Sequence, residues 1–214
     1  MNFFGHAAIA GRFRATPEFV LGAMLPDFAG MLGLKTPPIT PGALGEGVRC
    51  HHLTDHAFHE LRSFRAFCAE ATRFLDAEKV RRGTARAVAH VGVELLLDAA
   101  LAEGETARER YFAALAAARR AELFAPSSYG PEECNRFAGL AEVLEARGIS
   151  RNPDTELVVT RLERALASRP RLAIEPRDRP AIGSWVELFR DRVVASTPEL
   201  VGELTSALEP KLAA

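Results

Sequence analysis

The chain has few cysteines, and their spacing suits neither of the usual cysteine frameworks. Cys50, Cys68 and Cys134 are odd in number, and no two of them form a C-x-x-C pair. This pattern argues against a disulfide scaffold and against a cysteine zinc site. We therefore expect a protein of a reducing compartment and predict a cytoplasmic location.

Long apolar runs and an excess of charge of one sign are also missing. No run is long enough to predict a membrane span, and the mildly apolar N-terminus lacks the basic region of a signal peptide. Lysine and arginine number 27 against 28 aspartates and glutamates, which leaves a formal net charge of −1. Without a basic field, the chain is not expected to bind nucleic acid.

Alternating apolar and polar residues, which are typical of strands, are nearly absent, whereas alanine, leucine, arginine and glutamate are abundant. We predict an all-α fold with a single compact helical domain over residues 1–214, because no long linker divides the chain. Residues 1–102 would form its metal-binding half, and residues 103–214 would supply C-terminal helices that pack on it.

The helical pattern is interrupted at a few prolines and glycines. Pro26 is expected to end the second helix, and residues 33–47, with three prolines, are expected to form a loop. The predicted helices cover residues 2–12, 17–25, 46–76 with a break, 82–102, 107–122, 131–147, 153–168 and 183–196, followed by a last helix after Pro198.

Histidine is missing beyond residue 90, so all six histidines fall in the first part of the chain. Two segments share a spacing of four residues: His51, Asp55 and His59 in one, and His90, Glu94 and Asp98 in the other. On a helix, a step of four residues advances about 6 Å and turns about 40°, so neighbouring members of each set can bind one ion. We predict either one shared metal site, with some of these residues supporting the ligands, or two adjacent metals.

Glu94 and Asp98 lie in a helix with few other polar positions. An ionised carboxylate in an apolar interior costs several kcal/mol unless it is paired, hydrogen-bonded or metal-bound, so this pair predicts a nearby cation. The alternative is a structural ion pair with an arginine such as Arg86.

His51 and Asp55 offer an imidazole nitrogen and a carboxylate oxygen, which suit Zn²⁺, Mn²⁺ or Fe²⁺ better than Ca²⁺. His59 would extend this set, although a histidine-rich face that is only solvated or hydrogen-bonded is the alternative. His52 and His56 are rotated by about 100° from the first pair, so they cannot point at the same ion. His52 is expected to orient ligands or contact substrate, and a surface position for His56 is an equal alternative.

Two further residues extend the predicted site. Asp27 follows a predicted helix end, where it is either a metal ligand, a base, or a simple capping residue. His6 is an additional candidate ligand if the first helix packs across the cluster. Because no phosphate-binding glycine loop and no G-x-S-x-G turn is present, a metal-activated water is the favoured mechanism.

Four segments within residues 1–102 resemble the acyl carrier protein phosphodiesterase family, whose members are relatives of the HD-type metal phosphohydrolases. Residues 1–6 are similar to its Met-Asn-Phe-Leu-x-His start, and residues 22–28 to its Gly-x-x-x-x-Asp-Phe segment. Residues 47–55 resemble its Gly-Ile-x-x-His-Arg-x-Ile-Asp helix, and residues 94–101 its Asp-x-x-x-Asp-His-Phe-Leu helix. Zinc-dependent phospholipase C-like proteins are more weakly similar.

The resemblance implies an HD-like metal-binding core and release of 4′-phosphopantetheine from an acyl carrier protein by phosphodiester hydrolysis, with a divalent metal such as Mn, Fe or Zn. It assigns metal-binding or catalytic roles to Asp27, His51, Asp55, Glu94 and Asp98. The chain departs from the family where His52 replaces an arginine, Phe58-His59 replaces Thr-Asp, and Ala99 replaces a histidine.

We therefore expect a metal-dependent phosphodiesterase or phosphohydrolase. Asp27 would be a further ligand or the base for water, and His52, His59 or His90 would orient the water or protonate the leaving oxygen. The alternatives are a non-catalytic helical protein that binds a metal or a partner, and a hydrolase of lipid or nucleotide phosphates related to phospholipase C.

Overall fold

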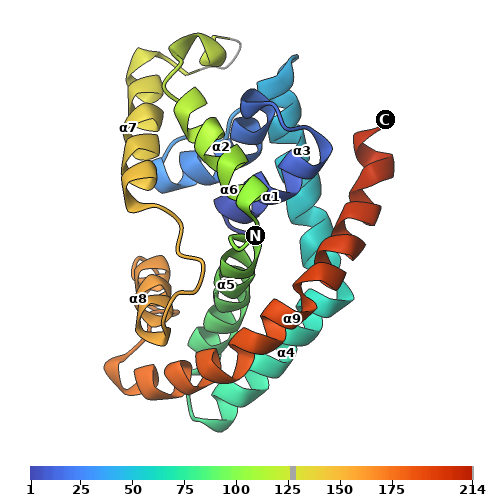
Figure 1. The fold of residues 1–214 in the computed structure, drawn as a ribbon. Helices are drawn as coiled ribbons and strands as arrows, with labels where there is room; N and C mark the ends of the chain where they lie inside the picture. The colour runs from blue at the N-terminus through green and yellow to red at the C-terminus, as the bar shows by residue number, and fades with distance from the viewer. Residues whose placement is uncertain (126–128, 214) are drawn as a thin grey trace. The chain divides into compact units, whose positions relative to one another are not determined.

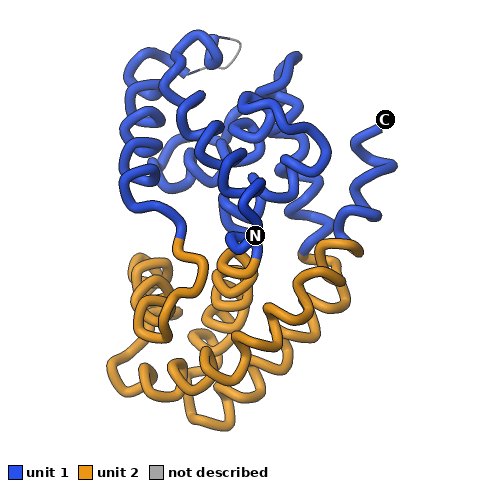
Figure 2. Tube along the Cα trace, in the orientation of Figure 1, with its two compact units in different colours: residues 1–58, 101–149, 204–214 blue, residues 59–100, 150–203 orange. Residues whose placement is uncertain are grey.

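The computed structural model describes residues 1–125 and 129–213, and these residues form helices and connecting turns with no strand. The predicted all-α class is confirmed. The chain divides into two compact units, each assembled from separate segments (Figure 2). Unit 1 contains residues 1–58, 101–149 and 204–214, and unit 2 contains residues 59–100 and 150–203. Each unit thus takes segments from both sides of residue 102.

Unit 1 is built on the helices α1 (Phe3–Phe13), α2 (Pro17–Leu32), α6 (Glu105–Ala117) and α7 (Pro131–Arg147), together with α3 (Ala43–Glu60) as far as residue 58 (Figure 1). A 3₁₀ turn, η1 (Ala121–Phe124), follows α6. The core of unit 1 is rich in aromatic rings. Phe4 packs edge-on against Tyr111, with 5.2 Å between ring centroids. Phe124 and Phe137 stack at 5.4 Å. The first contact joins α1 to α6, and the second joins η1 to α7.

Unit 2 contains α4 (Arg62–Ala77), α5 (Arg82–Leu101) as far as residue 100, α8 (Thr155–Leu166), the 3₁₀ turn η2 (Pro176–Asp178) and α9 (Arg179–Leu212) as far as residue 203. Trp185 and Phe189 of α9 are buried, with 5.6 Å between their ring centroids. A Cβ atom on Gly92 of α5 would lie 2.3 Å from the Trp185 ring. The missing side chain at Gly92 therefore makes room for the indole of Trp185.

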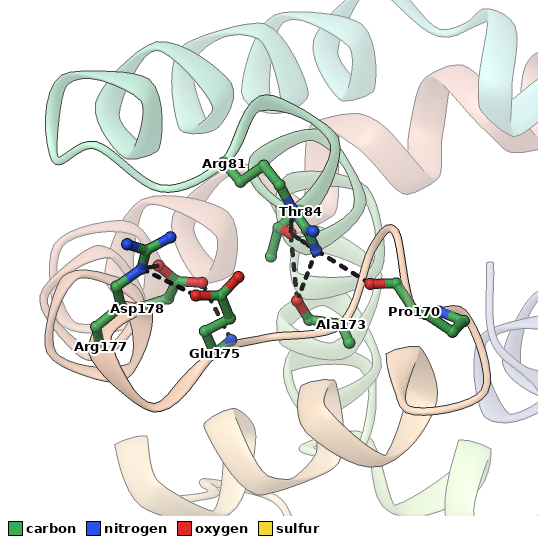
Figure 3. A network of polar contacts seen from close by, with 7 residues as sticks. All are labelled: Arg81, Thr84, Pro170, Ala173, Glu175, Arg177 and Asp178. Atoms are coloured by element: carbon green, nitrogen blue, oxygen red, sulfur yellow. Dashed lines mark hydrogen bonds and ion pairs between the residues drawn. The ribbon is translucent and has the colours of Figure 1, made fainter.

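A polar network joins the start of α5 to the segment between α8 and η2 (Figure 3). The guanidinium group of Arg81 donates to the carbonyl oxygens of Pro170 and Ala173, each at 3.2 Å. The fully buried hydroxyl of Thr84 also donates to the Ala173 oxygen, at 3.3 Å. These bonds hold an irregular segment of unit 2 by satisfying its backbone carbonyls.

Two predicted helix breaks at prolines are wrong. Helix α2 continues through Pro26 to Leu32, and it ends at Gly33, whose φ of 64° is the left-handed conformation that glycine adopts readily. Helix α9 likewise continues through Pro198. Directly before that proline, the hydroxyl of Thr197 donates to the Val193 carbonyl oxygen, one turn back along the helix, at 2.8 Å.

Other boundaries differ less from the prediction. The break expected within residues 46–76 lies at Leu61, between α3 and α4. The loop expected over residues 33–47 is shorter, because α3 already begins at Ala43. Gly45 permits this early start, since a Cβ atom there would lie 1.9 Å from the Thr40 carbonyl oxygen. Within the described residues, no helix combines the length and apolar character that a membrane span requires.

Candidate metal centres

Histidine and carboxylate side chains gather at two places, one in each unit. The unit 1 cluster consists of His6, Asp27 and His51, and each offers one ligand atom within 4.8 Å of the others. The unit 2 cluster consists of His59, His90 and Glu94 and meets the same criterion.

The unit 1 cluster depends on a close approach of the α2 and α3 backbones. A Cβ atom on Gly22 would lie 2.0 Å from the Leu44 carbonyl oxygen, and one on Gly47 would lie 2.2 Å from the Phe19 carbonyl oxygen. Only glycine fits such backbone contacts. Asp27 follows Gly22 by five residues and His51 follows Gly47 by four, so the contact brings the segments that carry both side chains together.

His51 is held by a backbone carbonyl of α2. Its Nδ1 lies 2.9 Å from the Ala23 oxygen, and because a carbonyl can only accept, Nδ1 donates the proton of this bond. The Nε2 lone pair is then available as a ligand, which is the usual orientation of a metal-binding histidine. Burial lowers the pKa of His51 to about 4, opposed by the Ala23 bond, so the imidazole is neutral at pH 7.

His6 of α1 completes the unit 1 cluster. It is only 1% exposed, and its ring stacks on that of His51 with 3.9 Å between centroids and 29° between planes. Asp27 is half-buried and supplies the carboxylate. Two imidazoles and a carboxylate form a typical donor set for Zn²⁺, Mn²⁺ or Fe²⁺, so the residues present fit the predicted class of metal.

The unit 2 cluster is more exposed than the unit 1 cluster. His59 Nε2 lies 3.2 Å from His90 Nε2. Glu94 Oε1 lies 3.5 Å from His59 Nε2 and 3.1 Å from His90 Nε2. The side chains of His59 and His90 are 31% and 45% exposed, whereas that of Glu94 is 9% exposed. Burial raises the pKa of Glu94, but opposing interactions, of which the hydrogen bonds with His59 and His90 are the largest, hold the pKa well below its usual value. The carboxylate is therefore ionised.

The remaining predicted site residues lie outside these two clusters. Asp55, one turn after His51, has its Oδ1 3.6 Å from the amino group of Met1. Asp98 is half-buried on α5, one turn after Glu94. His52 and His56 are exposed on α3, and His52 meets the His51 ring at 90° with 5.3 Å between centroids.

Spacing along single helices groups these residues differently from the structure. His6 was only an additional candidate, yet it stacks directly on His51. His59 and His90 were expected either to extend the two sets of ligands or to assist catalysis, and in the structure both lie against Glu94. The spacing of His90 and Glu94 was a usable signal, whereas the pairing of His59 with His90 depends on tertiary structure.

Comparisons with known proteins gave no match to a protein-family model, to a curated protein or to a solved structure.

Proposed function

We propose that the chain is a divalent-metal-dependent phosphodiester hydrolase whose metal is held by His6, Asp27 and His51. One observation carries the proposal. These three residues occupy three separate motifs of the acyl carrier protein phosphodiesterase resemblance, and they meet in unit 1 from α1, α2 and α3. Gly22 and Gly47, which permit the α2–α3 contact, belong to the motifs that contain Asp27 and His51. These two motifs therefore supply both the ligands and the close contact that brings their segments together.

Two residues of the unit 1 cluster, His51 and Asp27, have definable parts in this chemistry. His51 offers a neutral Nε2 because its Nδ1 proton is bound to Ala23, and Asp27 offers a carboxylate that lowers the charge of the centre. A bound divalent ion would polarise a phosphoryl oxygen and lower the pKa of a coordinated water. With three protein ligands, further coordination positions stay open for water and substrate.

His52 is the best-placed residue to move a proton at this site. It is exposed, and its ring meets that of the ligand His51. A group in this position can exchange protons with solvent and donate one to the leaving oxygen of a phosphodiester. The first substrate to test is the phosphopantetheine diester of an acyl carrier protein, followed by nucleotide and lipid diesters.

The test combines metal content with hydrolysis. Metal-free protein is reloaded with Mn²⁺, Fe²⁺ or Zn²⁺, and hydrolysis of bis(p-nitrophenyl) phosphate and of holo-acyl carrier protein is measured for the wild type and for Asp27→Asn, His51→Ala and His56→Ala. We expect the first two variants to lose one bound metal and at least ~100-fold in kcat/KM, because a ligand is lost. His56→Ala, which removes an exposed histidine of the same helix, is the matched control.

The burial of His6 and His51 favours a second candidate, a closed structural metal site. Stoichiometric metal that is lost in Asp27→Asn, together with no hydrolysis of any diester, would establish this candidate. Failure of the wild type to bind metal under replete conditions would contradict both functions.

A further inference from the structure

The three facing atoms of the unit 2 cluster form a nearly equilateral triangle. Its edges are 3.2 Å between the two Nε2 atoms, and 3.5 and 3.1 Å from these nitrogens to Glu94 Oε1. In a tetrahedral zinc site with bonds of about 2.0–2.1 Å, two ligand atoms are separated by about 1.6 bond lengths, or roughly 3.3 Å. The triangle therefore has the dimensions of one face of a tetrahedral zinc site.

Hydrogen bonds within the trio satisfy the three facing atoms only in part. If both imidazoles donate through Nε2 to Glu94, two N–H groups face each other at 3.2 Å, which is repulsive. If one or both rings carry the proton on Nδ1, at least one nitrogen lone pair faces the carboxylate oxygen. A divalent cation between the three atoms satisfies all of them at once, because each then points an electron pair at positive charge.

The cluster is also held in place by its neighbours within unit 2. The imidazoles lie nearly parallel, with 14° between planes and 5.0 Å between centroids. Phe64 of α4 meets both rings edge-on, at 5.5 Å from His59 and 5.3 Å from His90. The Arg65 side chain donates to the His59 carbonyl oxygen at 3.0 Å and fixes the backbone there. Such support limits the reorganisation that metal binding would require.

The exposure of the three side chains and the type of donor atom indicate which metal ion would bind. The histidines are partly exposed while the carboxylate is nearly buried, so an ion can enter from the histidine side. Two imidazoles and one carboxylate favour Zn²⁺ or a similar transition ion over Mg²⁺ and Ca²⁺, which prefer oxygen ligands.

We propose that His59, His90 and Glu94 form a second metal site, in unit 2, that binds Zn²⁺ or a similar transition ion with one coordination position left for water or another ligand. This site is separate from the proposed hydrolase centre of unit 1, and it does not rest on that centre being catalytic. His59 and His90 lie outside the motifs that carry the family resemblance.

The test is a Co²⁺ titration of the full-length, metal-free chain. Bound metal is counted by elemental analysis, and the visible d–d absorption reports tetrahedral coordination. We compare the wild type with Glu94→Gln, which keeps the side-chain volume but removes the charge, and with His90→Ala. Asp27→Asn reports the unit 1 cluster, His56→Ala is the histidine control, and circular dichroism monitors the helices of each variant.

We expect each unit 2 variant to lose one equivalent of Co²⁺ and the corresponding absorption, and His56→Ala to lose neither. If the unit 1 cluster does not bind metal, the wild type will bind one equivalent of Co²⁺, and His90→Ala will remove it. Failure of the proposed function can therefore be distinguished from failure of the second site. Unchanged stoichiometry and spectrum in Glu94→Gln and His90→Ala would overturn the second site. Loss of both equivalents from folded His90→Ala would also contradict two separate sites.

Discussion

The unit 1 and unit 2 clusters offer similar donors but are built in different ways. In unit 1, each ligand comes from a different helix, and the α2 and α3 segments meet through contacts that only glycine permits. In unit 2, His90 and Glu94 are one turn apart on α5, and Phe64 packs against both imidazoles. The first arrangement should therefore tolerate substitution of small residues poorly, and the second should depend mainly on its own side chains.

The largest effect is expected from Gly22→Ala. The new Cβ atom would lie 2.0 Å from the Leu44 carbonyl oxygen, which is backbone and cannot rotate away, so α2 and α3 must separate. We predict a loss of about 3 kcal/mol or more in the free energy of unfolding, at the upper end for overpacking. The unit 1 metal should be lost as well, as measured by urea denaturation and elemental analysis.

Gly30→Ala is the matched control on the same helix. A Cβ atom at Gly30 meets nothing within 4 Å, so alanine should stabilise the protein by about 0.5–1 kcal/mol through helix propensity. Equal effects of the two substitutions would contradict the role of the close contact.

Metal binding should give the next largest effect, and it separates the two clusters. At about 100 times the dissociation constant, one bound Zn²⁺ stabilises the folded state by about 2.7 kcal/mol, and a chelator should remove this gain. Asp27→Asn and Glu94→Gln should each abolish only the contribution of its own cluster. Thermal unfolding with and without zinc checks this, and a wild type that zinc does not stabilise would disprove binding at both places.

A smaller effect is expected from Gly92→Ala in unit 2. Here the new Cβ atom would meet the Trp185 ring at 2.3 Å, and a side chain can shift more readily than backbone. We predict a loss of roughly 2 kcal/mol, less than for Gly22→Ala, with a change in fluorescence because Trp185 is the single tryptophan. Gly202→Ala, which meets nothing within 4 Å on α9, should leave the fluorescence unchanged.

Features that depend on local sequence could be predicted, whereas features that depend on the packing of distant segments could not. Helical composition predicted the all-α class and a break somewhere within residues 46–76, because these depend on local preference, whereas the structure locates that break at Leu61. Pro26 and Pro198 were misread as helix ends, since surrounding structure can stabilise a helix through a proline. The pair His90 and Glu94 is visible as a spacing of four, whereas the stacking of His6 on His51 depends on how α1 and α3 pack.

The smallest predicted effect contrasts a loop contact in unit 1 with the polar network of unit 2. The Tyr129 hydroxyl donates to the Lys35 carbonyl oxygen at 2.6 Å, and burial, with a smaller contribution from the charge of Glu133, raises the pKa of Tyr129 to about 12. The stabilisation associated with this shift is complete below about pH 10 and is lost as the pH rises toward 12, because the unfolded phenol ionises first.

Tyr129→Phe should therefore cost more at pH 8 than at pH 11.5, with a difference below about 1 kcal/mol because the side chain is only half-buried. Thr84→Val removes the hydroxyl that bonds to Ala173 in unit 2, and its cost should not change with pH in this range, because that hydroxyl does not titrate. Urea midpoints of both variants and the wild type at the two pH values provide the measurement. A pH-independent cost for Tyr129→Phe would mean that the folded phenol ionises as readily as the unfolded one, so the contact with Lys35 would contribute a hydrogen bond but no linkage to pH.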